Sequence, residues 1–188
     1  MKRSTKGMLW GTAAAVLLGT SPAVAQVGLT SSLATVNINA TKSSVLSLAI
    51  NSGGTQNLAS LTDNTTNNFA SPVNITTTWD LNAGSNVVLV GSFATPAQAL
   101  ASGTNFITTT YIKGRMTTGT PTSYTAFTQN GVGTIGTAGG SLTLFTQSTA
   151  ALAGNRTDNL DLQIDLTGHA NLIPGTYTGT LNLQAIVQ

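Results

Sequence analysis

The sequence predicts an all-β protein that folds as an antiparallel β-sandwich. Many short segments alternate apolar and polar residues, which is the period of a half-buried strand. Turn signals such as Asn82-Ala83-Gly84, Asn130-Gly131 and Gly139-Gly140 separate these segments. The chain has no cysteine and 40% hydrophobic residues. Stability therefore has to come from burial and backbone pairing rather than from disulfides.

The first 25 residues predict a secretory signal peptide. Residues 2–6 are rich in lysine and arginine, residues 8–18 are largely apolar, and Ala23-Val24-Ala25 gives the small-x-small pattern of a cleavage site. We expect cleavage after Ala25 and export to the periplasm, the cell surface or the medium. The apolar run is short for a membrane span, which needs about 20 residues. The alternative is an uncleaved anchor, and no later segment is apolar enough to cross a bilayer.

Two regions follow the expected cleavage site. Residues 26–44 form an N-terminal extension, in which residues 33–41 alternate like a strand but have no partner connected by a tight hairpin. Such a segment can pair within its own domain or add to the exposed sheet edge of a neighbour. Residues 45–188 are expected to form one sandwich domain, because a chain of this length can bury a core.

The strands of that domain are predicted from alternation and from apolar runs. Residues 87–90 are all apolar and predict a strand buried on both faces. Residues 96–101 begin with proline after Thr95 and predict the one helical turn. The predicted strands are 46–50, 73–81, 87–90, 106–112, 123–128, 142–145, 160–166 and 177–187.

Few residues are suited to chemistry. Removing residues 1–25 leaves four basic side chains against five aspartates, a formal net charge of −1 and no basic patch for nucleic acid. His169 is the only histidine and lies in a predicted turn, and no G-x-S-x-G motif is present. We therefore expect a protein that is not an enzyme, with no catalytic residue and no cofactor.

The aspartates give no obvious metal site. Asp161 and Asp165 lie on one strand face about 13 Å apart, too far to ligate one ion on a straight strand. The alternative for Asp158 is a Ca²⁺ site completed by loop carbonyls, because Ca²⁺ takes oxygen ligands. The simpler interpretation is a solvated polar face, and no metal ligand is assigned.

The C-terminal run 174–188 resembles the closing strand of chaperone–usher pilins, in particular the spore-coat-U-like group. It carries a proline-glycine-x-aromatic-x-glycine pattern followed by alternating residues. Gly175 stands where that family often has a glycine, whereas Val187 replaces its frequent aromatic residue. The residues that carry the resemblance are Gly175, Tyr177, Gly179, Leu181, Leu183 and Val187.

The resemblance implies a pilin-like surface subunit of a fimbrium or secreted coat. Its fold would be an immunoglobulin-like sandwich that lacks its last strand, and the N-terminal extension of one subunit would fill the groove of the next. The implied partners are other copies or related subunits, together with a periplasmic chaperone. The residues expected to enter the groove are Leu33, Val36, Ile38 and Ala40.

The alternative to a structural subunit is a ligand-binding protein. A self-contained secreted sandwich could act as an adhesin or glycan-binding module through loops at one end. Trp79, Tyr111 and Tyr124 would then be the candidate ligand-binding residues, although the simpler interpretation of Trp79 is a core side chain.

Overall fold

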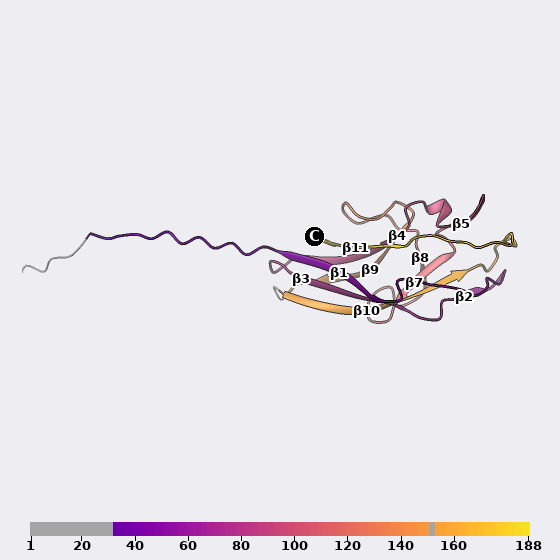
Figure 1. The fold of residues 1–188 in the computed structure, drawn as a ribbon, viewed down its shortest axis with the longest axis horizontal. Helices are drawn as coiled ribbons and strands as arrows, with labels where there is room; N and C mark the ends of the chain where they lie inside the picture. The colour runs from indigo at the N-terminus through magenta and orange to yellow at the C-terminus, as the bar shows by residue number, and fades with distance from the viewer. Residues whose placement is uncertain (1–31, 151–152) are drawn as a thin grey trace, which may run out of the picture. The chain divides into compact units, whose positions relative to one another are not determined.

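The computed structural model describes residues 32–150 and 153–188. The expected signal peptide and the first residues of the extension lie outside this range. The chain divides into two units, Met1–Ala40 and Thr41–Gln188. The second unit is an antiparallel β-sandwich, which confirms the predicted fold class (Figure 1).

The larger sheet is built around the long strand β10 (Ala153–Asp165). Its strand order is β1-β3-β10-β7-β8, and β2 also pairs with β10. All of these pairings are antiparallel. The other members are β1 (Val45–Ser52), β2 (Thr66–Asn68), β3 (Val73–Asp80), β7 (Ile112–Met116) and β8 (Thr125–Ala126).

The smaller sheet packs across the core in the order β11-β4-β9. It consists of β4 (Asn86–Ser92), β9 (Ser141–Ser148) and β11 (Asn182–Val187). A separate hairpin joins β5 (Leu100–Ser102) to β6 (Asn105–Ile107). The predicted helical turn is a single 3-10 turn, η1 (Pro96–Gln98), and the residues after it enter β5.

The alternation of apolar and polar residues along the strands determines which side chains form the core. Along β3, the odd-numbered residues from Val73 to Trp79 are buried, while its even-numbered residues are half-buried or exposed. Strand β4 is buried on both faces, as its unbroken apolar run predicts. Val87 and Leu89 belong to the main core, and Val88 and Val90 pack under Ile135 on the outer face of the sheet.

The strand order matches most of an immunoglobulin sandwich, whose two sheets are ABED and CFG. Strands β1, β3, β10 and β7 lie in the A-B-E-D order, and β4 and β11 take the places of C and F. Strand β9 lies beyond β4, at the side away from β11. Among the described residues no strand pairs with the outer edge of β11, where strand G would lie.

Three predicted strands are shorter in the structure. Residues 108–111 form a turn between β6 and β7, in which the Tyr111 amide donates to the Thr108 carbonyl at 3.2 Å. Only Thr125–Ala126 of the segment 123–128 pairs as a strand. The closing strand begins at Asn182 rather than at Tyr177, because residues 177–181 run beside β5, where Thr178 bridges Ala101.

Candidate functional site

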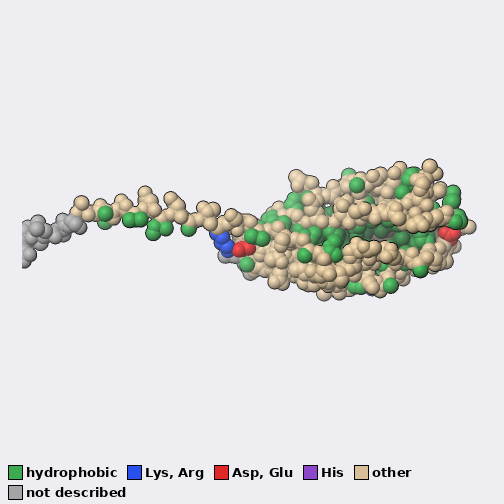
Figure 2. All heavy atoms as spheres, viewed as in Figure 1, with side chains coloured by type: hydrophobic (Ala, Val, Ile, Leu, Met, Phe, Trp, Pro, Cys, Tyr) green, Lys and Arg blue, Asp and Glu red, His purple; other side chains and the backbone are tan. Residues whose placement is uncertain are grey.

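An apolar groove separates the edge strands β1 and β11. These strands end the two sheets on the same side of the sandwich, and neither contains a buried residue. A hollow of about 200 Å³ lies between Leu46–Leu48 and Leu183–Ala185. Figure 2 shows hydrophobic side chains recessed between the two polar layers in this region. The inward side chains that pack against the core from these two edges are Leu46, Leu48, Leu183, Ala185 and Val187.

The opposite side of the sandwich is closed. The segment after β8 crosses from the larger sheet to the smaller one, where Gln129 bridges Ser141 of β9. Phe127 in this segment is fully buried and packs edge-on against Phe93 with ring centroids 5.3 Å apart. A Cβ on Gly91 would lie 2.9 Å from the Phe127 ring, so glycine makes room for that ring. Among residues 32–150 and 153–188, the side between β1 and β11 is therefore the one where apolar side chains of the core are left uncovered.

The N-terminal extension carries exposed apolar side chains. Residues 32–44 form no strand, although residues 33–41 alternate like one. Leu33, Val36 and Ile38 are 91%, 83% and 87% exposed, and Ala40 is also exposed. In an extended segment Val36, Ile38 and Ala40 share one face, and Leu33 lies on the other. Of the four residues expected to enter a groove, Val36, Ile38 and Ala40 can therefore enter it together. Leu33 would point away from the groove.

The C-terminal residues singled out from the sequence divide into two groups. Leu183 and Val187 lie on β11 and face the groove side of the core. The other group, which precedes β11, consists of Gly175, Tyr177, Gly179 and Leu181. A Cβ on Gly179 would come within 2.0 Å of the Ala99 carbonyl oxygen, so this glycine permits close packing beside β5.

His169, Asp161 and Asp165 each make contacts within the fold. His169 lies in the turn after β10, where its ring meets the edge of Tyr111 with centroids 4.5 Å apart. Asp161 pairs with Arg115 at 3.0 Å, and Asp165 pairs with Lys113 at 2.6 Å. Hydrogen bonds from Lys113, and then from Thr167, lower the pKa of Asp165 from 3.8 to about 2. Both carboxylates thus belong to cross-strand ion pairs between β10 and β7.

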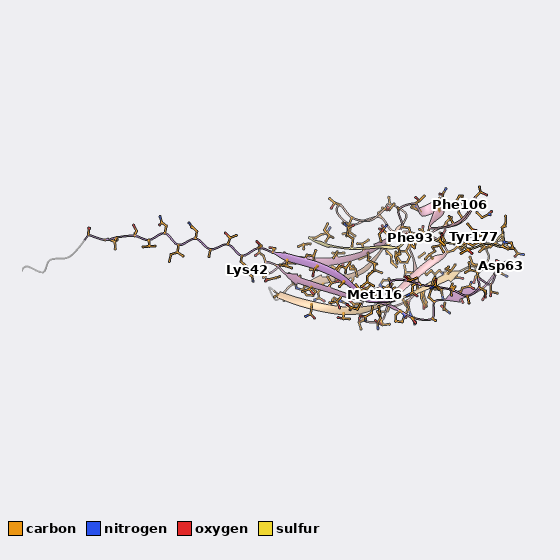
Figure 3. The ribbon with its side chains drawn as sticks, viewed as in Figure 1. Lys42, Asp63, Phe93, Phe106, Met116 and Tyr177 are labelled. Atoms are coloured by element: carbon orange, nitrogen blue, oxygen red, sulfur yellow. The ribbon has the colours of Figure 1, made fainter. Side chains whose placement is uncertain are left out.

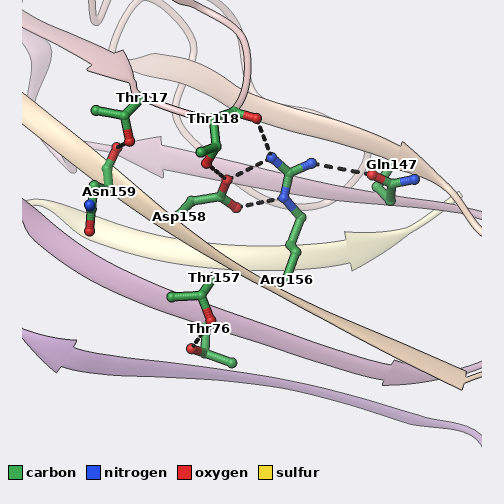
Figure 4. A network of polar contacts seen from close by, with 8 residues as sticks. All are labelled: Thr76, Thr117, Thr118, Gln147, Arg156, Thr157, Asp158 and Asn159. Carbon is green, nitrogen blue, oxygen red and sulfur yellow. Dashed lines mark hydrogen bonds and ion pairs between the residues drawn. The ribbon is translucent and has the colours of Figure 1, made fainter.

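Asp158 has a structural environment that the sequence did not reveal. It lies inside β10 rather than in a loop and is 2% exposed. Arg156 donates two hydrogen bonds of 2.6 Å to its two carboxylate oxygens, and Thr118 donates a third (Figure 4). The same guanidinium donates to Gln147 of β9 at 3.3 Å and lies over the Phe145 ring.

This network leaves Asp158 little capacity for a cation. Both oxygens already accept hydrogen bonds from the guanidinium, which neutralises the carboxylate. The Ca²⁺ alternative also assumed a loop at this position, and the structure has a strand there. Within residues 32–150 and 153–188 no group of three or more His, Cys, Asp or Glu side chains is placed to hold a metal ion.

The three aromatic residues considered for ligand binding make packing contacts within the sandwich. Trp79 is 7% exposed and packs over Gly154, where a Cβ would lie 2.8 Å from the indole. Tyr111 packs against the core, and Tyr124 lies under the Arg115 guanidinium at 4.7 Å. Figure 3 marks Lys42 and Asp63 at opposite ends of the sandwich.

Comparison of the chain with models of known families, with characterised proteins and with solved structures finds no match. In the part of the chain that the structure describes, no helix has the length and apolar character needed to cross a membrane.

Proposed function

We propose that this chain is an exported structural subunit that assembles by β-strand addition. Residues 34–40 of one copy would lie in the groove between β1 and β11 of another. The observation that carries the proposal is the one-sided sandwich. Its closed side is filled by Phe127, whereas its open side has two free sheet edges over an apolar floor.

The groove and the extension are complementary. The outer edge of β11 has backbone groups that no strand in the described residues uses, and an extended segment can pair with such an edge. Val36 and Ile38 lie on one face of the extension, and each contributes about 1.5–3 kcal/mol when it moves from water into an apolar site. The same insertion would cover the half-buried side chains of β1 and β11.

A groove of another copy fits better than the chain's own groove. To lie beside its own β1, the extension would have to reverse direction within residues 41–44. Tight hairpins favour glycine, asparagine or aspartate at the turn, and Thr41-Lys42-Ser43-Ser44 contains none of them. Lys42 also forms an ion pair of 2.9 Å with Asp80, at the end of β3 beside the start of β1.

Strand addition of this kind produces a polymer. The donor and acceptor surfaces differ, so the contact is heterologous and does not close on itself unless the rotation forms a ring. Filaments built in this way need no covalent cross-link, which suits a chain without cysteine. The resemblance of residues 174–188 to pilin closing strands points in the same direction.

The test compares two charge-matched double variants of the chain that begins at Gln26. Val36→Asp with Ile38→Asp places charges on the face that would enter the groove, so we expect light scattering to show loss of assembly. Asn37→Asp with Asn39→Asp adds the same charges to the opposite face and should still assemble. Far-UV circular dichroism checks that both variants keep the sandwich. Equal assembly by the two variants would contradict the proposal.

A further inference from the structure

A second hollow lies on the larger sheet, away from the residues that line the groove. It has a volume of about 490 Å³, which is within the range of small-molecule sites. Residues 52–57 form one wall, the turn 70–72 before β3 forms another, and Asn74 and Asn159 complete the lining. We call this hollow the amide pocket.

The lining of the amide pocket is neutral and polar. None of its residues is charged, and its polar groups are amides and hydroxyls from Ser52, Thr55, Gln56, Asn57, Ser71, Asn74 and Asn159. Its apolar part comes from small groups, including Ala70 and Pro72. Because no opposite charge is present, the pocket has little means of selecting an ion.

The amides on the floor of the pocket are held in place. Asn51 donates to the Asn74 side-chain oxygen at 2.7 Å, and Asn74 donates to the Asn159 side-chain oxygen at 2.6 Å. Gln56 donates to the Gly53 carbonyl at 2.8 Å. Gly53 has a φ of +74°, and a Cβ there would lie 2.4 Å from the Pro72 carbonyl oxygen, so this wall requires glycine.

Some hydrogen-bonding groups that line the pocket are not used within the fold. Among the described residues, the side chains of Asn57 and Ser71 and the Asn159 amide nitrogen have no intramolecular partner. An amide both donates and accepts, as does a hydroxyl group. A ligand rich in hydroxyl groups can therefore satisfy these side chains in pairs, while its C–H groups contact Ala70 and Pro72.

We infer that the amide pocket binds a neutral saccharide. The inference stands apart from the proposed assembly, because none of the groove residues lines this pocket. It also differs from a site built on Trp79, Tyr111 and Tyr124, because each of these rings packs against other residues of the same chain. Recognition in the amide pocket would rest on hydrogen bonds rather than on aromatic stacking.

The test uses saturation-transfer difference NMR, which observes the saccharide and works whether or not the protein assembles. Maltotriose, cellotriose, mannotriose and N,N′,N″-triacetylchitotriose are the neutral probes, and sialyllactose is the charged one. We expect at least one neutral trisaccharide to give a saturable signal at millimolar concentration, and sialyllactose to give none.

Two variants place the binding in the pocket. Asn159→Ala removes a floor amide and should weaken binding about fivefold to tenfold, the effect of losing one or two hydrogen bonds. Ser71→Trp fills the mouth without breaking an internal hydrogen bond and should abolish binding. Asn155→Ala is the matched control, because Asn155 lies on the same face of β10 but outside the pocket.

Three results would overturn the inference. The first is the absence of a saturable signal from every neutral trisaccharide. The second is stronger binding of sialyllactose, which would contradict a neutral ligand. The third is unchanged binding in the Ser71→Trp variant, which would place the saccharide elsewhere on the protein. Thermal unfolding of each variant checks that lost binding does not reflect lost folding.

Discussion

Removing one partner of the Arg156–Asp158 pair should destabilise the sandwich strongly. Replacing Arg156 by Ala leaves the Asp158 carboxylate, which is 2% exposed, without its two guanidinium hydrogen bonds. Breaking a buried pair by removing one partner costs about 3–5 kcal/mol. A domain is typically stable by about 5–15 kcal/mol, so this single change should remove a large part of the total.

Replacing both partners should cost much less than the sum of the two single changes. In Arg156→Met with Asp158→Leu no buried charge remains, and apolar replacements of buried pairs are often neutral or stabilising. Arg156→Met, Asp158→Leu and the double variant complete a double-mutant cycle. Trp79 is the only tryptophan left after residue 25, so its fluorescence during urea unfolding reports on the core directly.

Additive losses in the cycle would show that Arg156 and Asp158 are not coupled. If Arg156→Ala costs less than about 1 kcal/mol, or if the double variant loses the sum of the single losses, the pair acts like an exposed surface ion pair. The close contacts in Figure 4 would then contribute little to folding.

Three further predictions concern other parts of the chain. Phe127→Ala should lower the free energy of unfolding by about 3–5 kcal/mol, because it empties the closed side of the core. In a variant that does not assemble, Leu183→Ala should cost clearly less, because this side chain is only half-buried; urea unfolding measures both. Asp165→Asn should be destabilising at neutral pH by at most about 2 kcal/mol, less after solvent screening. Because the folded pKa is about 2 and the ordinary value is 3.8, the difference from wild type should persist above pH 3.8 and disappear as the pH falls through 2, and a constant difference would contradict the pKa shift.

The sequence was most informative where one face of a strand is buried. Alternation from Val73 to Trp79 located β3, and the unbroken run from Val87 to Val90 located a strand covered on both faces. In both cases burial requires a fixed pattern of apolar residues, so the pattern is visible without the structure.

The sequence was least informative where contacts between residues far apart in the chain determine the local structure. Residues 177–181 alternate like a strand, but their place beside β5 depends on Thr178 bridging Ala101. Asp158 lies close to Asp161 and Asp165 in the sequence, but its even number places it on the inward face of β10, opposite to theirs. Its partner Arg156, which is half-buried, offered no charge pattern that identifies an ion pair with a buried carboxylate. Likewise, the amide pocket gathers three separate segments that no local motif connects.

Disulfide trapping between copies tests the proposed strand addition most directly, because the chain has no cysteine of its own. One chain would carry Ala185→Cys in the groove, and a second chain would carry either Val36→Cys or Ile38→Cys. We expect covalent dimers on a non-reducing gel for at least one of these pairs, and little cross-linking when Asn37→Cys, on the opposite face, replaces them. Equal cross-linking from Asn37→Cys, or none from any pair, would contradict the proposal that the extension enters the groove of another copy.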